Sequence, residues 1–463
     1  MNWIILFALI FIILEAVQAF IRCDSGNWEQ VAPIDKSNHG SYARSPMTPV
    51  AEQKGEKEWE SFACPSQALQ YSCYYHEGNN NATDGKSRAY EVEYRRFKPS
   101  NAACLDFHPF DFLSAIKNRN ILLLGDSVVN QVFQTLLCDL NSAVEGTVSM
   151  EWQGTNPQNR RLCPYGAKHC HPIHGFVNYR TPNATIRSVV AAIYKADMIR
   201  SVLSEHKPSK DDVLLVNFGL HYNEPHTLEA SLSSLVQELY SLSQGHTVQL
   251  PHLLFMQTLP QHFPTSNGYW DNVKSPHSKA CRPDIPGSID DIIKRMDELD
   301  WRNKVADKII SEYNAKVKSE CTSATAGARA CNLIDIIYTA RPIYSQFDAH
   351  IGFTPFFWFG HADCTHYCQP SAIFDVVHMA MYNALVDKLN MRQQIKSKSE
   401  FLLGQRSELL IKGSGKQVYL LKLDGRYAFT GLQSFVSRGY DFSDVVTYPD
   451  SIVDNIPVVG SLH

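Results

Sequence analysis

A serine in one stretch of the sequence, and an aspartate and a histidine in another, have the types and spacing of a nucleophile with its proton acceptor. Ser127 directly follows Gly125 and Asp126, and Asp363 precedes His366 by three residues. On a helical turn, an aspartate and a histidine at this spacing share one face, so the carboxylate can orient the imidazole. The imidazole can then take the proton of the serine hydroxyl. Ser127, Asp363 and His366 are therefore the predicted catalytic residues.

The residues around Ser127 predict a buried strand followed by an amphipathic helix. Ile121 to Leu124 is an apolar run that Gly125 ends, and apolar residues then recur with a helical period from Val128 to Leu140. At such a turn the hydroxyl lies at the sheet edge, and the first amides of the helix point towards charge that develops there. The alternative is that Asp126 or Ser127 is a simple helix N-cap.

Strands and helices alternate along the middle of the chain. Further buried strands are predicted at 213–218, 253–256 and 332–337, and helices at about 187–204, 228–243, 288–317 and 371–392. This alternation predicts an α/β fold, in which a mostly parallel sheet is flanked by helices. Its ligand is expected at the carboxyl ends of the strands.

Four segments are predicted along the chain. They are a signal peptide or signal anchor at 1–22, a cysteine-rich N-terminal lobe at 23–115, the α/β catalytic domain at 116–395 and a small C-terminal module at 396–463. In the module, 417–423 and 426–429 flank an Asp-Gly turn and predict a β-hairpin, with a short helix near 432–437 and a strand near 445–448. This composition indicates a β-rich binding or spacer module.

The first residues and the cysteines indicate the secretory pathway. Trp3 to Leu14 is an apolar run with Ala19 after it, shorter than the roughly 20 residues of a membrane span, so a cleaved signal peptide is favoured over an anchor. Twelve cysteines, an even number, predict a disulfide framework. Sequons predict glycosylation at Asn81 and Asn183. The formal net charge of -4 argues against nucleic acid as a partner.

Three motifs occur in the order of the blocks of SGNH (GDSL-type) hydrolases: Gly125-Asp-Ser127, Asn217-x-Gly219 and Asp363-x-x-His366. Over about residues 23 to 390 the chain resembles the trichome-birefringence-like branch of the PC-esterase family, the plant polysaccharide O-acetyltransferases. The other matching features are Cys64-Pro65, Cys73, Cys104, Cys138, Thr258-x-Pro-x-His262-Phe263, Asp348-Ala-His350 and Asp363-Cys-x-His-Tyr-Cys368. The last of these is the most specific.

The resemblance implies an acyl-enzyme route. Ser127 would attack an acetyl donor while His366 takes its proton and Asp363 fixes the imidazole tautomer, and a polysaccharide or glycan hydroxyl would then receive the acetyl group. By their positions, the Ser127 amide, Gly219 and the Asn217 side chain are the candidate oxyanion donors. No bound cofactor or metal is expected, since the acetyl donor is a co-substrate. The expected location is the Golgi lumen, the cell wall or the outside of the cell, with the membrane reached only through an N-terminal anchor.

Some residues depart from the plant pattern. Asn130 and Gln131 stand where plant members carry arginine and asparagine, and Asn-Phe-Gly-Leu-His-Tyr at 217–222 replaces Asn-Thr-Gly-His-Trp-Trp. Asn130 and His262 are predicted to bind substrate, with a structural histidine at a loop as the equal alternative for His262. The acceptor need not be xylan.

Four alternatives remain open at this point. With the same triad, water in place of a sugar hydroxyl would make an acetylesterase. If the triad were not catalytically active, the protein would be a glycan-binding pseudoenzyme. Asp348 with His350 is a second aspartate and histidine pair. The remaining alternative is a zinc site with four ligands, Cys163, Cys170, His171 and His174.

Overall fold

The computed structural model describes the chain in segments. They are residues 21–30, 48–53, 56–60, 92, 95–107, 109–143, 148–152, 173–178, 183–244, 250–270, 281–323, 332–352, 362–369, 371–389, 391, 409–422, 425–436, 445–447, 453 and 458–462. Apart from Ile21 and Arg22, the predicted signal segment lies outside them. Within these segments, no helix combines the length and the apolar character that crossing a membrane requires.

The chain divides into two compact units. The first contains Met1–Val31 and Pro46–Lys388, and the second contains Ala32–Ser45 and Leu389–His463. The four segments proposed from the sequence, with boundaries after residues 22, 115 and 395, stay predictions.

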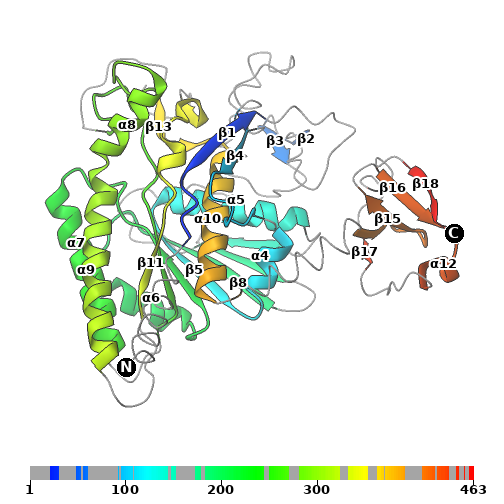
Figure 1. The fold of residues 1–463 in the computed structure, drawn as a ribbon, viewed down its shortest axis with the longest axis horizontal. Helices are drawn as coiled ribbons and strands as arrows, with labels where there is room; N and C mark the ends of the chain where they lie inside the picture. The colour runs from blue at the N-terminus through cyan, green and yellow to red at the C-terminus, as the bar shows by residue number, and fades with distance from the viewer. Residues whose placement is uncertain are drawn as a thin grey trace, which may run out of the picture. The chain divides into compact units, whose positions relative to one another are not determined.

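A seven-stranded sheet forms the centre of the first unit, in the order β11-β10-β9-β5-β8-β7-β6 (Figure 1). Its strands are β5 (Asn120–Gly125), β6 (Val148–Trp152), β7 (Ile173–Asn178), β8 (Asn183–Val190), β9 (Val213–Val216), β10 (His252–Met256) and β11 (Ile334–Ile337). Strands β11 to β8 run parallel, and β7 and β6 are antiparallel additions beyond β8. Because β8 and β9 lie on opposite sides of β5, the winding reverses between β5 and β9, where such sheets bind ligands.

Helices cover both faces of this sheet. Their bounds are α4 (Pro109–Ala115), α5 (Ser127–Ala143), α6 (Met198–His206), α7 (Pro225–Gln244), α8 (Ile289–Leu299), α9 (Trp301–Ser323) and α10 (Ala372–Lys388). On one face, Leu122 and Leu214 pack with side chains of α6, α7 and α9, and the last two helices lie side by side (Figure 1). The alternate residues Ile121 and Leu123 are fully buried on the other face, where α5 and α10 contact the sheet. Burial on both faces accounts for the uninterrupted apolar strands, and the predicted α/β fold is confirmed.

Two predicted helices differ from the structure. Residues 187–204 were expected to be helical, but β8 extends to Val190 and pairs in parallel with β5 along its length, so only α6 is a helix. β-branched residues favour this strand, and its partner is distant in sequence. The single helix expected at 288–317 is two helices, α8 and α9, separated at Asp300.

The described residues of the N-terminal lobe include two antiparallel strand pairs. They are β1 (Gly26–Gln30) with β4 (Arg95–Pro99), and β2 (Thr48–Gln53) with β3 (Glu56–Glu60). A disulfide joins Cys23 to Cys104 and closes the first pair. Trp28 donates its indole N–H to the carbonyl oxygen of Pro342 at 2.6 Å. The prediction of a cystine-held lobe is therefore confirmed.

A further pair of short strands lies outside the main sheet. These are β12 (His350–Gly352) and β13 (Asp363–Tyr367), which run antiparallel with a register shift between His350 and Gly352. Two 3-10 turns, Arg341–Ile343 and Phe347–Ala349, precede β12. Strand β13 carries two of the three predicted catalytic residues.

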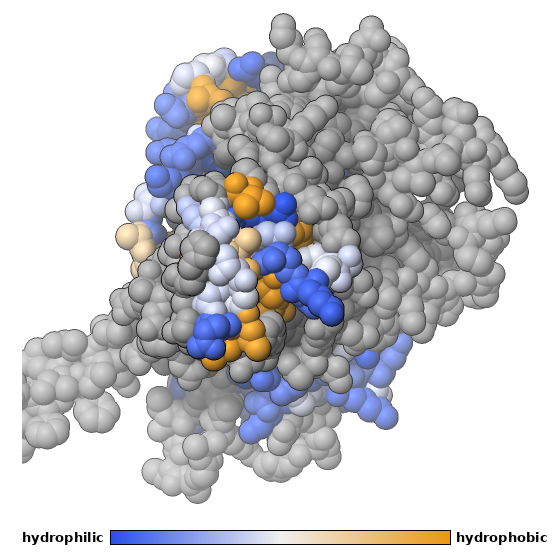
Figure 2. All heavy atoms as spheres, turned by 90° about the vertical axis from the view of Figure 1, so that its right-hand side faces the viewer, coloured by the Kyte–Doolittle hydropathy of each residue, from blue (hydrophilic) through white to orange (hydrophobic). Residues whose placement is uncertain are grey.

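The second unit contains the predicted β-rich module. Its five-stranded sheet has the order β17-β14-β15-β16-β18. The elements are β14 (Leu409–Lys412), β15 (Val418–Lys422), β16 (Gly425–Phe429), α12 (Leu432–Val436), β17 (Val446–Thr447) and β18 (Val458–Leu462). Strands β15 and β16 form the predicted hairpin. Leu432, Val436 and Val458 remain more than half exposed, at 63%, 54% and 56%, and Figure 2 shows apolar residues among hydrophilic ones on the described surface that faces the viewer.

Candidate active site

The three predicted catalytic residues lie within hydrogen-bonding distance of one another. The Oγ atom of Ser127 is 2.7 Å from Nε2 of His366, although the two residues are 239 positions apart. The Nδ1 atom of His366 is 2.8 Å from Oδ2 of Asp363. Hydroxyl, imidazole and carboxylate thus follow one another in the order of a serine nucleophile with its proton acceptor and the group that orients it.

The turn between β5 and α5 leaves the hydroxyl of Ser127 free for this contact. The helix is capped by its neighbour Asp126, whose Oδ1 accepts from the amides of Val128 at 2.9 Å and Val129 at 3.3 Å. A Cβ atom at Gly125 would lie 2.5 Å from Cγ2 of Val129, so the turn requires glycine. The N-cap alternative therefore applies to Asp126 and does not occupy the serine.

Asp363 and His366 meet in a strand, and the expected helical turn is not formed. Oδ1 of Asp363 accepts from the amides of Thr365 and His366, each at 3.0 Å, and this local turn brings the carboxylate back to the imidazole. Oδ2 accepts the Nδ1 proton of His366. The tautomer with the proton on Nδ1 leaves the lone pair of Nε2 facing the hydroxyl of Ser127, which is the arrangement of a general base.

The charges of the pair stabilise each other. Burial disfavours a charged imidazole, but the carboxylate of Asp363 outweighs it and raises the pKa of His366 above its ordinary value. Burial also opposes ionisation of Asp363, but the imidazole and the amide hydrogen bonds outweigh it and lower the pKa of this carboxyl. The side chain of His366 is 16% exposed and that of Asp363 is 3% exposed. The base is thus accessible, while its carboxylate is shielded.

Strand β13 is anchored by residues that the motifs did not reveal as functional. The side chain of Gln131, one helical turn after Ser127, donates from Nε2 to the carbonyl oxygen of Tyr367 at 2.9 Å. Its Oε1 accepts from the amide of Tyr367 at 3.3 Å. A disulfide joins Cys281 to Cys364, next to Asp363. Gln131 therefore connects the nucleophile helix to the strand of the base. Its spacing from Ser127 was the only signal in the sequence.

The predicted oxyanion donors differ in their availability. Among the described residues, no hydrogen-bond partner is present for the backbone amides of Ser127 and Gly219. The side chain of Asn217, in contrast, donates from Nδ2 to the carbonyl of Met256 at 2.8 Å and to Oγ1 of Thr258 at 3.2 Å. These two acceptors would compete with an oxyanion for the protons of this amide, and the assignment of Asn217 as an oxyanion donor stays a prediction. The two backbone amides remain candidates.

The two residues predicted to bind substrate are fully buried. Asn130 has no exposed surface, and its Oδ1 accepts from Oγ of Ser188 at 3.4 Å. His262 also has no exposed surface, and its Nδ1 is 2.6 Å from Nε2 of His350. A ligand would contact either side chain only after a rearrangement, and their assignment to substrate contact stays a prediction. The position of Asn130 on a helix and of His262 after a strand did not reveal that other segments bury these side chains.

The other candidates from the sequence have different outcomes. Asp348 accepts hydrogen bonds from both terminal nitrogens of Arg95, at 2.7 Å and 2.5 Å, and the ring nitrogens of His350 face His262 and the carbonyl oxygen of His366, so both members of the second aspartate and histidine pair have other partners. The glycosylation candidate Asn183 is the first residue of β8. The remaining candidates lie outside the described residues or have only their backbone described: Asn81, Cys163, Cys170, His171 and His174.

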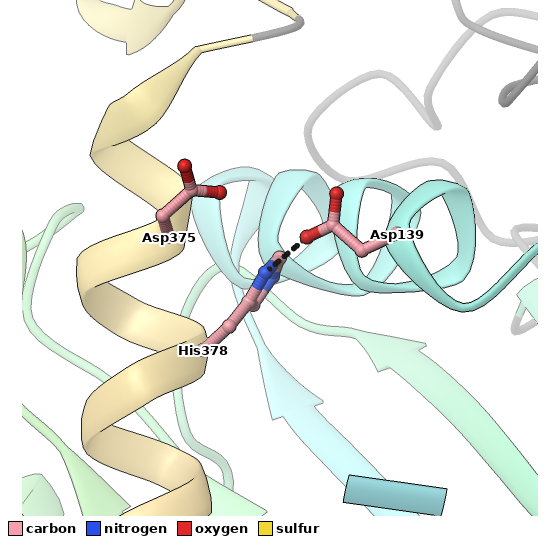
Figure 3. Close-up of side chains that lie close together, drawn as sticks. All are labelled: Asp139, Asp375 and His378. Carbon is pink, nitrogen blue, oxygen red and sulfur yellow. Dashed lines mark hydrogen bonds and ion pairs between the residues drawn. The ribbon is translucent and has the colours of Figure 1, made fainter. Parts of the chain in front are cut away.

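A buried ion pair connects the nucleophile helix to α10. Nδ1 of His378 is 2.7 Å from Oδ2 of Asp139 (Figure 3). Its Nε2 is 3.2 Å from the carbonyl oxygen of Val132. Asp375, one turn before His378, lies close to the same atoms (Figure 3). This contact fixes α5 from its far end.

His221 is a further residue of the site that the sequence did not single out. It follows Gly219 by two residues, and burial lowers its pKa, while the charges of Asp126 and His366 act on it in opposite directions. These interactions place it close to the nucleophile turn. The unusual motif at 217–222 was the signal for this residue.

A parallel sheet with reversed winding beside its first strand, and a serine, histidine and aspartate close together, are features that serine hydrolases and acyltransferases of the SGNH class have. Residues 105–241 match the family model described as PC-Esterase, the GDSL/SGNH-like acyl-esterase family found in Pmr5 and Cas1p. This segment is therefore similar to the PC-esterase family, the family that the motifs suggested. No curated protein matches the chain.

Proposed function

We propose that this protein is an O-acetyltransferase that moves an acetyl group, through an acetyl-serine at Ser127, onto a hydroxyl of a polysaccharide or glycan. The observation that carries the proposal is the unbroken line of short contacts from Ser127 Oγ through His366 to Asp363. A line of this kind activates a serine towards acyl groups. The similarity of residues 105–241 to the PC-esterase family supports an acyl ester as the substrate.

The first half of the reaction loads the enzyme. Ser127 Oγ attacks the acetyl carbonyl of the donor, and its proton moves to Nε2 of His366 as the new carbon–oxygen bond forms. The carbonyl oxygen becomes an oxyanion, for which the amides of Ser127 and Gly219 are the proposed donors. When the bond to the donor breaks, the leaving group takes the proton from His366. Asp363 stabilises the imidazolium that exists between these two proton transfers.

The second half transfers the acetyl group. A sugar hydroxyl attacks the acetyl-serine and gives its proton to His366, and the bond to Ser127 Oγ breaks as the serine recovers that proton. No bound cofactor takes part, because the donor is a co-substrate. An acetylesterase would use the same residues with water as the second nucleophile, so the two activities differ in which hydroxyl reaches the acetyl-serine.

The secretory pathway is the proposed location. The disulfides Cys23–Cys104 and Cys281–Cys364 support an oxidising compartment, because such bonds rarely persist in the cytosol. The Golgi lumen, the cell surface and the cell wall are the compartments in which a polysaccharide acceptor and such an enzyme would meet.

The test follows the acetyl group. Full-length protein, expressed with its disulfides, is incubated with acetyl-coenzyme A or 4-nitrophenyl acetate, and the peptide that contains Ser127 is analysed by mass spectrometry, with Ser127→Ala as the control. We expect an acetyl adduct in the wild-type protein alone. Discharge faster with oligosaccharides than with buffer identifies a transferase, while equal discharge identifies an esterase. Absence of an adduct with every donor would refute the proposal.

A further inference from the structure

Two fully buried histidines form a hydrogen-bonded chain that ends on the main chain of His366. Nδ1 of His262 is 2.6 Å from Nε2 of His350, and Nδ1 of His350 is 3.1 Å from the carbonyl oxygen of His366. Neither His262 nor His350 has any exposed surface. This pair of hydrogen bonds is separate from the contacts that His366 makes through its own ring.

The acceptor at the end of the chain fixes the proton on each ring. A carbonyl oxygen accepts only, so Nδ1 of His350 carries a proton. In a neutral ring its Nε2 is then a lone pair, which accepts the Nδ1 proton of His262. The Nε2 atom of His262 is left as a lone pair and makes no hydrogen bond within the described part of the chain, although the backbone carbonyl of Tyr344 lies near this ring. Both histidines therefore adopt the Nδ1–H tautomer.

Burial keeps both rings neutral. It lowers the pKa of His262 to about 3, against a smaller opposite effect of the Tyr344 carbonyl. It lowers the pKa of His350 well below the ordinary value, and His262 adds to this effect. The ring of His350 also stacks on that of Tyr367, with centroids 4.3 Å apart. The pair is thus a rigid, uncharged support beneath β13.

We propose that His262 and His350 are positioning residues, which hold the backbone of His366 so that its Nε2 stays at hydrogen-bonding distance from Ser127 Oγ. The catalytic consequence rests on the proposed function, whereas the arrangement of protons does not. Strand β13 lies outside the main sheet and has a register shift opposite it, so sheet pairing alone fixes this backbone less firmly. A displacement of about 1 Å at such a site can cost about 100-fold in rate.

The first experiment reads the tautomers directly. In protein labelled with ¹⁵N on histidine, long-range ¹H–¹⁵N spectra distinguish Nδ1–H from Nε2–H rings. The signals of the two residues are assigned by their loss in His262→Asn and His350→Asn. We expect two neutral Nδ1–H rings in the wild-type protein. An Nε2–H tautomer or an imidazolium at either position would overturn the proposed chain, whatever the enzyme does.

The second experiment separates positioning from folding. Asparagine at position 350 can keep a donor near the place of Nδ1, whereas leucine of similar size cannot. The rate at which a fluorophosphonate labels Ser127 is measured for both variants, on protein shown by circular dichroism to be folded. We expect a loss of about 10- to 100-fold in the maximal rate for His350→Leu, with unchanged affinity for the reagent, and recovery to within about threefold in His350→Asn.

The outcomes of the second experiment are distinguishable. Folded His350→Leu that labels at the wild-type rate, or a loss in His350→Asn as large as in His350→Leu, would refute the positioning role. Wild-type protein that is not labelled at Ser127 would refute the proposed function instead, and the tautomer spectra would still decide the arrangement of the histidine pair.

Discussion

Replacement of Gln131 by leucine tests the connection between the nucleophile helix and the strand of the base. Gln131 has no exposed surface, and its carboxamide bonds both the carbonyl and the amide of Tyr367, at 2.9 Å and 3.3 Å. Leucine has a similar volume but leaves both backbone groups buried without these partners. Each unsatisfied group costs about 1–3 kcal/mol, so Gln131→Leu should lower the free energy of unfolding by roughly 2–5 kcal/mol. Labelling of Ser127 by a fluorophosphonate should also slow.

The same helix offers a matched control. Gln134 is 1% exposed, and neither polar atom of its side chain has a hydrogen-bond partner among the described residues. Gln134→Leu removes no such bond and should be neutral or stabilising. Urea denaturation of both variants, with m-values compared to detect altered unfolded states, measures the difference. If the two variants lose equal stability, or if Gln131→Leu loses less than about 0.5 kcal/mol, the reasoning is wrong.

Three further predictions use the same labelling assay. Asp363→Asn replaces the acceptor of the Nδ1 proton, which favours the wrong tautomer of His366, and should reduce the rate about 10⁴-fold without unfolding the protein. Gly219→Ala would place a Cβ atom 2.0 Å from Oγ1 of Thr258, so we expect a loss of at least about tenfold that Thr258→Ala partly reverses in the double variant. Because the net effect of Asp363 and burial raises the pKa of His366, the rate should rise with pH through a midpoint above 6.5, and a midpoint at or below this value would contradict the pairing. The stability of the protein should change with pH in the opposite direction to the rate. The stabilisation that comes from the raised pKa of His366 is fully present below the pKa of this histidine in the unfolded state, and it is lost as the pH rises through its pKa in the folded state.

Local patterns were sufficient to predict the nucleophile turn. The apolar run of β5, the glycine after it and the helical period of α5 all come from neighbouring residues, so the strand, turn and helix around Ser127 follow from the sequence alone. The hairpin of β15 and β16 was predicted for the same reason. In both cases the structure of the segment is determined by its own residues and not by a distant partner.

The errors arose where a distant partner decides the structure. Strand β8 was predicted as part of a helix, because its period is ambiguous until β5 pairs with it. The positions of His262 and Asn130 suggested contact with substrate, whereas their burial depends on the segments that cover them and could not be predicted from those positions. The carboxamide of Asn217 has the right type for an oxyanion donor, yet Met256 takes one of its protons. Residue type and position do not reveal such competition.

The active site is divided between a part that local sequence determines and a part that tertiary contacts determine. The matched family segment, 105–241, contains Ser127 and Gly219, whereas Asp363 and His366 lie beyond it on a strand outside the main sheet. That strand is held by Gln131 from the nucleophile helix, by the disulfide to Cys364 and by the buried histidine pair. Because the anchors come from separate segments, each can be changed without touching the reacting groups, and their separate effects on the rate measure how firmly the base must be held.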